Sequence, residues 1–190
     1  MCPWPTVKNR LVYYMMYKIL LILFTFSCAR TGLDQKYNRK EWKHWIDSDR
    51  DCLDTRNEIL HMRSKISAKL NARGCKVVSG IWEDYYYPTQ LKETKMIDID
   101  HLIPLKNAHE NGGFDWTQNE RAIFANDPEN LVITNRSYNR KKGAKGIDSW
   151  LPVHKIYACK YIHDWIKIKK KYRLKITNKE NLAIQMNNCK

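Results

Sequence analysis

The sequence is poor in acidic residues, in long apolar runs and in the cysteine pairs typical of zinc sites. Its 190 residues include 34 Lys and Arg but only 20 Asp and Glu, a formal net charge of +14. This deficit of acids favours a polyanion or an anionic surface as the partner. No CxxC pair occurs, which argues against a structural zinc site built on cysteines. No internal repeat or low-complexity tract is present, so we expect one globular domain with extensions.

The apolar run near the N-terminus is too short to cross a membrane. Residues 19–26 (ILLILFTF) provide fewer than half of the roughly 20 residues that a membrane helix needs. Basic residues precede this run and Ser27-Cys28-Ala29 follows it, which is the order of a secretory signal. We therefore expect residues 1–29 to be a signal peptide and the chain to be secreted or periplasmic. Three alternatives stay open: a lipoprotein signal that ends before Cys28, with a lipid anchor; a docked N-terminal helix; and a true start at Met15 or Met16.

Four cysteines follow the expected cleavage point: Cys52, Cys75, Cys159 and Cys189. An even number of cysteines in an exported chain indicates disulfides, and three connectivities can be drawn. Cys52 and Cys75 flank a predicted helix and are the preferred pair. That choice would leave Cys159 for Cys189.

Apolar periodicity and turn residues predict short strands that alternate with helices. The predicted helices cover 37–46, 54–70, 117–124, 136–142 and 154–172, and the predicted strands cover 76–78, 81–86, 96–101 and 130–134. We expect an α+β domain over residues 30–175. Residues 176–190 are expected to form a polar, loosely held C-terminal tail.

The predicted strand at 96–101 ends with a carboxylate beside an imidazole. Ile97 and Ile99 alternate with Asp98 and Asp100, His101 follows directly, and a proline ends the strand three residues later. Further along, a short strand opens with Asn130-Leu131, and the next helix carries Asn139 and ends at Lys142-Gly143. This order suits phosphodiester hydrolysis. A carboxylate and an amide oxygen can hold one hard divalent cation, while a neutral imidazole takes a proton from water.

At these residues the sequence resembles the HNH endonucleases, the ββα-metal or His-Me finger group. Their pattern DHIxPL…NL…N..KG is matched by DHLIPL at 100–105, NL at 130–131 and NRKKG at 139–143. The resemblance extends to small exported proteins akin to the C-terminal nuclease domain of GmrSD-type restriction enzymes. Stretches from HWIDSDRDC at 44–52 through Cys159 carry it. It implies a ββα-metal finger embedded in a small, mostly helical domain.

The resemblance also implies a role for each matched residue. Asp100 and Asn139 would be metal ligands and His101 the general base. Asn130 would bind across the loop and hold the finger, and Lys142 would contact a phosphate. An amide ligand in place of histidine favours Mg²⁺ or Mn²⁺ over Zn²⁺.

Each of these residues alone has a more ordinary explanation. A histidine at a strand end is usually packed, asparagines often occupy turns or caps, and Lys-Gly often ends a helix. Their ordered combination favours the nuclease. The competing functions are a non-catalytic basic module that binds nucleic acid and an exported calcium-binding structural protein.

The calcium alternative depends on the loop Asp47–Glu58. Its acids follow the spacing of an EF-hand, with Cys52 where that motif has glycine. The candidate ligands are Asp47, Asp49, Asp51 and Glu58, and a structural loop whose acids cap the next helix is the competing interpretation.

The expected partner is nucleic acid, with DNA preferred over RNA and the chain acting as a monomer. Arg121 is a second candidate for phosphate contact, and a buried ion pair with Asp127 or another acid is an equal alternative. Lys160, Lys167 and Lys171 share one face of the last long helix, where they are either solvated or in contact with phosphate. No separate base-reading module is visible, so sequence-specific recognition is not expected.

Overall fold

The computed structural model describes residues 36–189, so the expected signal segment lies outside the described part. Its helices are α2 (Thr55–Met62), α3 (Leu105–Glu110), α4 (Gln118–Ala125), α5 (Arg136–Lys142), α6 (Lys155–Lys171) and α7 (Asn178–Asn187). Single 3-10 turns are η2 (Arg39–Glu41), η3 (Thr94–Met96), η4 (Gly113–Asp115) and η5 (Pro128–Asn130). Among these residues, no helix is long and apolar enough to span a membrane.

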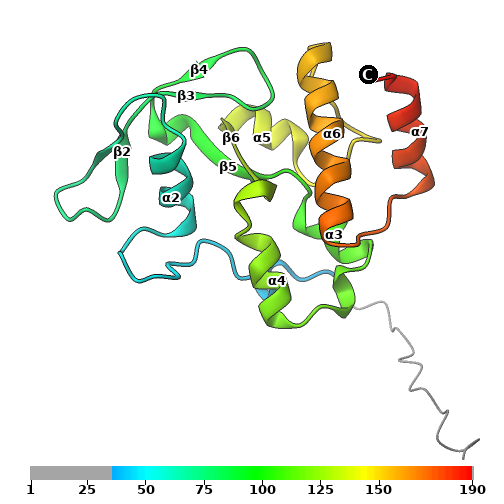
Figure 1. Cartoon of the computed structure of the whole chain (residues 1–190), viewed down its shortest axis with the longest axis horizontal. Helices are drawn as coiled ribbons and strands as arrows, with labels where there is room; N and C mark the ends of the chain where they lie inside the picture. Colours follow the sequence, from blue (N-terminus) through cyan, green and yellow to red (C-terminus); the bar gives the residue numbers. More distant parts are fainter. Residues whose placement is uncertain (1–35, 190) are drawn as a thin grey trace, which may run out of the picture. The chain divides into compact units, whose positions relative to one another are not determined.

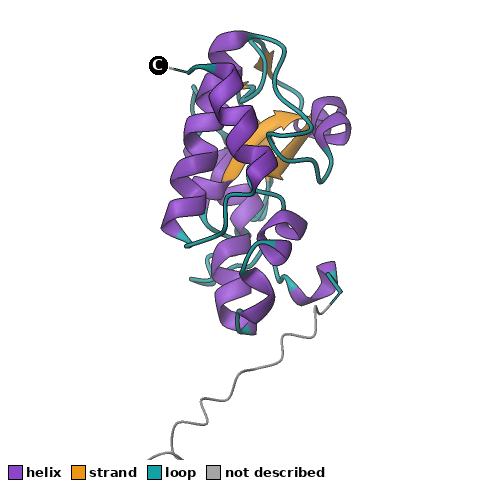
Figure 2. Ribbon diagram, turned by 90° about the vertical axis from the view of Figure 1, so that its right-hand side faces the viewer, coloured by secondary structure: helices purple, strands orange, loops and turns teal. Residues whose placement is uncertain are grey.

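The strands form three separate antiparallel pairs. They are β1 (Lys69–Leu70) with β2 (Val77–Ser79), β3 (Trp82–Glu83) with β4 (Gln90–Leu91), and β5 (Ile97–His101) with β6 (Leu131–Asn135). The α+β class expected from the sequence is confirmed. Helices pack around β5 and β6, whereas the two shorter strand pairs lie at one edge of the domain (Figures 1 and 2).

Strands β5 and β6, followed directly by α5, form the centre of the fold. The register runs from Ile97 opposite Asn135 to His101 opposite Leu131. Because side chains alternate along a strand, β5 has two different faces. Ile97 and Ile99 pack into a cluster with residues of α2, whereas Asp98 and Asp100 contact α5. The strand pair therefore lies between the two helices, as Figure 1 shows.

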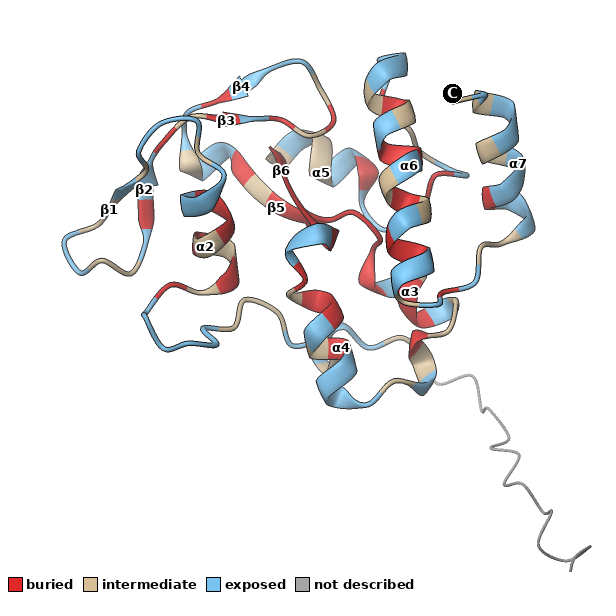
Figure 3. Cartoon of the chain, in the orientation of Figure 1, coloured by how far each residue is buried: buried red, intermediate tan, exposed pale blue. Residues whose placement is uncertain are grey.

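A second and larger apolar cluster fills the space between β6, α4 and α6. Tyr86, Phe124, Tyr161 and Trp165 are fully buried in it. Burying such large side chains stabilises the fold by roughly 1.5–3 kcal/mol each. In Figure 3 the buried residues of α6 follow one side of the helix, which is the side that the sequence period predicts.

Two predicted helices differ from the structure. The helix expected over 54–70 ends at Met62, and beyond it the backbone N–H of Lys65 donates to the carbonyl of Ile81. The side chain of Arg63, the C-cap residue, donates hydrogen bonds to the carbonyls of Leu131 and Pro128. Residues 69–70 then pair with β2. The helix expected over 37–46 is only the η2 turn, and Trp45 has φ of 60°, a left-handed conformation that cannot continue an α-helix.

The expectation of a loosely held tail was wrong. Residues 178–187 form α7, which begins with a capping box between Thr177 and Glu180. Glu180 is buried and pairs with Lys169 of α6, with a distance of 2.9 Å between Nζ and Oε1. A disulfide joins Cys159 to Cys189 as well. One ion pair and one cross-link thus fix α7 to α6.

The structure contains both disulfides preferred from the sequence, Cys52–Cys75 and Cys159–Cys189. Their Cα–Cα distances are 4.9 and 5.2 Å. Both lie within the usual range for bridged cysteines. The first disulfide ties the acidic loop before α2 to the β1–β2 hairpin.

Replacing Cys52 and Cys75 together by serine should lower the free energy of unfolding by about 3 kcal/mol. The bridge closes a loop of 23 residues and so restricts the unfolded chain. Urea denaturation of the parent and the double variant measures the difference. Peptide mapping without reduction is the control, and free thiols at both positions in the exported protein would contradict the pairing.

Candidate active site

Asp100, on the α5-facing side of β5, is held by a buried lysine and a buried tyrosine. Its Oδ2 lies 2.8 Å from Lys142 Nζ and accepts a hydrogen bond of 2.7 Å from the Tyr86 hydroxyl. Lys142 also donates to the carbonyl of His101 at 2.9 Å. The side chain of Lys142 is 0 % exposed, so the phosphate contact expected of it is not available in this structure. Lys142 instead neutralises Asp100.

Asn139 lies beside Asp98 and not beside the predicted partner Asp100. The amide nitrogen of Asn139 is 3.1 Å from Asp98 Oδ2. Arg136, one turn earlier on α5, donates from Nε to Asp98 Oδ1 at 3.2 Å. These side chains are partly exposed, in contrast to the Asp100–Lys142 pair. The open part of the α5-facing side thus contains one carboxylate, one amide and one guanidinium.

His101 projects from the opposite side of β5 and is buried. Its Nε2 donates a hydrogen bond of 2.9 Å to the carbonyl of Ala125, the last residue of α4. The Trp45 ring stacks on it at 5.8 Å, and the His44 ring lies edge-on at 5.9 Å. Burial lowers the pKa of His101 to about 3, the Ala125 hydrogen bond opposes this, and the charge of Arg39 lowers it further. The imidazole is therefore neutral at neutral pH.

Adjacent residues of a strand cannot point to the same face, so Asp100 and His101 can share a ligand only at an edge of β5. One edge is paired with β6, and β5 has no second strand partner among the described residues. Lys142 donates to the outward carbonyl of His101 at this other edge. The unpaired edge is thus the place where the carboxylate face and the imidazole face meet.

Asn130 fixes the loop that follows His101. Its Oδ1 accepts a hydrogen bond of 2.8 Å from the backbone N–H of Ile103, and its own carbonyl accepts from the N–H of Leu102 at 2.8 Å. The side chain is fully buried. An asparagine in this position links the start of β6 to the end of β5, so it acts on the geometry of the hairpin.

The donor set on the α5-facing side suits a hard divalent cation. Asp98 and Asn139 lie together, with the amide nitrogen of Asn139 on Asp98 Oδ2, so the amide would have to rotate to present its oxygen to a cation. Both contacts to Asp100 use Oδ2, so Oδ1 can turn to a cation while Lys142 and Tyr86 stay bound. Carboxylate and amide oxygens are the ligands that Mg²⁺ and Mn²⁺ prefer.

Arg121 is a buried structural residue. Its guanidinium forms an ion pair with Glu41 and donates to the carbonyl of Phe114 at 2.9 Å. Of the two alternatives drawn from the sequence, the structure has the buried ion pair, with Glu41 as the acid and not Asp127. A phosphate contact by Arg121 would require that pair to break.

The acidic loop before α2 brings three carboxylates together. One oxygen each of Asp47, Asp49 and Asp51 lie within 4.8 Å of one another, and all three residues are exposed. Burial and then the charges of these acids raise the pKa of Glu58. The entering helix of an EF-hand is absent, since residues 42–46 are not helical. The loop is therefore EF-hand-like in ligand spacing only.

Sequence reasoning missed three residues that the structure places at the site. Asp98 was correctly predicted to share a face of β5 with Asp100, but it was not predicted to be a metal ligand. Its spacing of two residues from Asp100 could have indicated that role. Tyr86 reaches Asp100 from the turn after β3, and His44 reaches His101 from the N-terminal segment. Such long-range contacts leave no local pattern in a sequence.

One known family matches most of the described chain. The family described as GmrSD restriction endonucleases, C-terminal domain, matches residues 53–185, a range that includes β5, β6 and α5. The chain belongs to this GmrSD C-terminal domain family. Its family therefore indicates a nuclease-type function.

A fungal relative has a similar sequence over most of its length. An uncharacterized secreted protein of Arthroderma benhamiae is 34% identical over 162 residues, which cover 83% of this chain and 78% of the relative. The two disulfides of the GmrSD-family domain described here fit an extracellular protein. No solved structure matches the chain.

Lys142→Met should lower the free energy of unfolding by about 3–5 kcal/mol, because it leaves the Asp100 carboxylate buried without its cation. Lys141→Met is the matched control. Lys141 is the exposed neighbour on α5, and its loss should cost less than about 0.5 kcal/mol. Urea denaturation measures both variants, and equal small effects would contradict a structural ion pair at Lys142.

Proposed function

We propose that the chain is an exported, metal-dependent endonuclease that hydrolyses phosphodiester bonds in DNA, with His101 as the general base. The main support is one juxtaposition within a nuclease-family domain. Oxygen ligands lie on one side of β5 and a neutral imidazole on the other, and both can reach the unpaired edge of the strand. A scissile phosphate at this edge would be in reach of both sets.

His101 has the tautomer that a general base needs. A carbonyl can only accept, so the hydrogen bond to Ala125 places the ring proton on Nε2 and leaves the lone pair on Nδ1. Nδ1 takes a proton from water, the water oxygen attacks phosphorus, and the bond to the leaving oxygen breaks. The ring's low pKa makes it a weak base in the free protein. A phosphodiester beside it adds negative charge, which raises the pKa toward neutrality.

The oxygens of Asp98, Asp100 and Asn139 are the proposed ligands of one Mg²⁺ or Mn²⁺. When bound there, the cation supplies positive charge to the phosphate and to the leaving oxygen. Lys142 and Tyr86 keep Asp100 in position from the buried side. Arg136 is partly exposed and pairs with Asp98, so it could orient a phosphate beside these ligands once that pair opens.

The competing function is a basic module that binds nucleic acid without cutting it. The net positive charge would suit such a module equally well, but binding alone does not require a neutral imidazole on the strand that carries the proposed metal ligands. Cleavage of a plasmid in the presence of Mg²⁺ or Mn²⁺, and its loss in EDTA, separates the two functions.

His101→Ala should lower the rate of plasmid nicking by about 10²–10⁴-fold, because the proton acceptor is removed. Binding of DNA and of Mn²⁺ should stay close to the parent values. Asp98→Ala and Asn139→Ala should also lose nicking, but high metal concentration should restore part of it. Gel assays of supercoiled plasmid over a metal titration distinguish these two kinds of loss.

His61→Ala is the control for His101, since His61 is exposed on α2 and remote in sequence from the finger. His101→Gln keeps a polar side chain in the buried position if the alanine variant folds poorly. A folded His101 variant that nicks at the parent rate would refute the base assignment. A parent protein that binds DNA but cuts it with no divalent metal would favour the binding module.

The acidic loop remains a separate calcium prediction. Millimolar Ca²⁺ should raise the melting temperature of the parent, because a ligand that binds only the folded state stabilises it. Asp49→Ala should abolish the rise and leave metal-dependent nicking in place. Thermal melts with Ca²⁺ and with EDTA measure this, and a parent melting temperature that Ca²⁺ does not change would exclude the site.

A further inference from the structure

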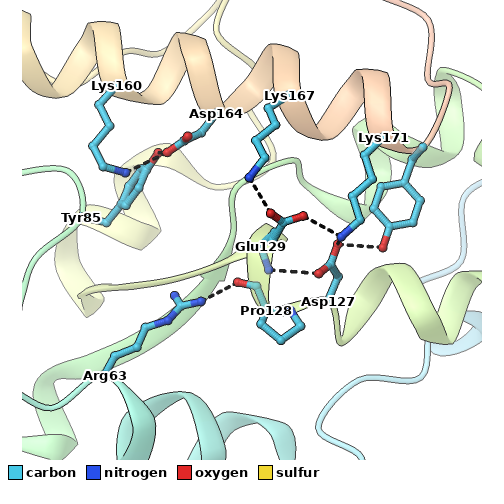
Figure 4. A network of polar contacts seen from close by, with 10 residues as sticks. Arg63, Tyr85, Asp127, Pro128, Glu129, Lys160, Asp164, Lys167 and Lys171 are labelled. Atoms are coloured by element: carbon cyan, nitrogen blue, oxygen red, sulfur yellow. Dashed lines mark hydrogen bonds and ion pairs between the residues drawn. The ribbon is translucent and has the colours of Figure 1, made fainter.

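Both cations that the sequence assigned to phosphate are buried, so a nucleic acid must contact other residues. Three lysines of α6 do not serve this purpose well, because acids neutralise them (Figure 4). Lys160 pairs with Asp164, Lys167 with Glu129, and Lys171 with Asp127 and Glu129. A phosphate would have to compete with those carboxylates.

The cations of another hollow are similarly compensated. This groove, of about 610 Å³, runs between the outer edge of β6 and the start of α6. Its cations are already used: Arg63 donates to two backbone carbonyls, and Lys65 pairs with Glu83. The groove therefore lacks the excess positive charge that a nucleic acid backbone attracts.

Helix α5 and the loop after it differ from α6 and the groove because most of their cations have no acidic partner in the part of the chain that the structure describes. The stretch 130–147 contains five cations and no acid. Of these, Arg140, Lys141 and Lys145 are exposed, and none of them takes part in an ion pair among the described residues. This loop also borders an open depression of about 470 Å³.

The basic segment extends along α5 to the metal-ligand face. Residues three or four apart on a helix are neighbours, so Arg136 lies beside both Asn139 and Arg140. Positive charge in a last helical turn is often explained by the helix dipole. That explanation does not cover Lys145, which lies beyond the helix, or Arg136, which lies at its start.

A pair of stacked tyrosines adjoins the same cations. The rings of Tyr138 on α5 and Tyr87 after β3 lie 3.7 Å apart with an interplanar angle of 24°. Both residues are partly exposed, and Lys141 Nζ lies 5.9 Å from the centre of the Tyr138 ring. Flat aromatic surfaces beside cations are typical of sites where unpaired bases stack.

We propose that Arg140, Lys141, Lys145 and the Tyr87–Tyr138 stack form a binding surface for single-stranded nucleic acid. The cations contact the backbone, and an unstacked base packs on the tyrosine rings. The strand then continues past Arg136 to the ligands on β5. This surface rests on the proposed nuclease function for its biological purpose, but its binding can be measured without cleavage.

The test uses fluorescein-labelled dT20 and a 20-base-pair duplex in EDTA, with binding followed by fluorescence anisotropy. The triple variant R140Q/K141Q/K145Q should bind dT20 at least 10-fold more weakly than the parent at 0.1 M salt. The slope of log K against log salt should fall in magnitude by about 2, since each lost phosphate contact on a single strand contributes about 0.7. Tyr138→Leu should weaken dT20 binding about 10-fold and duplex binding much less.

The matched control is K69Q/R73Q/K76Q on the β1–β2 hairpin. It removes the same three charges, one Arg and two Lys, from residues that are equally exposed and unpaired in the described part. It should keep both the dT20 affinity and the salt slope within twofold of the parent. Circular dichroism melts check that all variants are folded.

Equal losses in the two triple variants would overturn the proposal, because binding would then follow net charge alone. Parent-like affinity in R140Q/K141Q/K145Q would overturn it as well. A Tyr138→Leu variant that loses duplex and single-strand binding equally would refute the preference for single strands. A parent that binds dT20 through this surface but never nicks DNA would uphold the surface and refute the proposed endonuclease.

Discussion

The buried ion pair between Asp100 and Lys142 determines the arrangement of the candidate site. Removing two charges from water is costly, and the structure offsets that cost with further hydrogen bonds. Lys142 also donates to the carbonyl of His101, and Asp100 also accepts from Tyr86, whose ring packs against Trp150 and Tyr161. A strand, a helix and an aromatic core meet at this pair. The end of α5 can therefore take only one position over β5, and that position brings Asn139 to Asp98.

A second buried carboxylate performs a similar task at the other end of β6. Asp84 accepts from the hydroxyl of Thr134 and from the backbone N–H groups of Asn135 and Tyr86. Burial raises its pKa, and these hydrogen bonds act in the opposite direction. The residue joins the turn that carries Tyr86 to the point where β6 passes into α5. The two carboxylates together define where α5 begins and where it ends.

Much of the fold could be predicted because its signals are local. Helix α5 was predicted at its observed limits, and α4, α6 and β6 to within one or two residues, since caps and apolar periods lie inside each segment. The end of α2 was missed because the contacts beyond it are long-range and leave no local pattern. The N–H of Lys65 donates to the carbonyl of Ile81, and the side chain of Arg63 donates to carbonyls of residues 128 and 131. The tail was missed for the same reason. Its polar sequence gave no apolar face, and its fixed position comes from one buried ion pair and one disulfide.

The candidate site shows the same division. The order of residues along the sequence predicted that Asp100, His101, Asn130 and Asn139 belong to one site. It could not predict which charged side chains would form ion pairs with each other. Lys142 and Arg121 were both predicted to contact phosphate, yet each forms an ion pair within the protein. Lys142 pairs with Asp100, and Arg121 pairs with Glu41. A charge can be counted from sequence, whereas its availability depends on burial and partners. Phosphate binding therefore has to be assigned to cations that remain exposed and unpaired.

The adjacency of Asp100 and His101 follows from the geometry of the strand. Two residues on the same face would be separated by one position and would approach a ligand from the same side. Consecutive residues approach from opposite sides, and they can do so only where the strand edge has no partner. A phosphate at that edge would meet carboxylates on one side and a neutral imidazole on the other, separated by the thickness of the backbone. Lys142 still lies near the imidazole, because its amine donates to the His101 carbonyl and its charge lowers the pKa of the ring, while the hydrogen bond to Ala125 sets the tautomer. In the proposed mechanism, the unpaired edge of β5 is thus the place where Asp100 and His101 would act together.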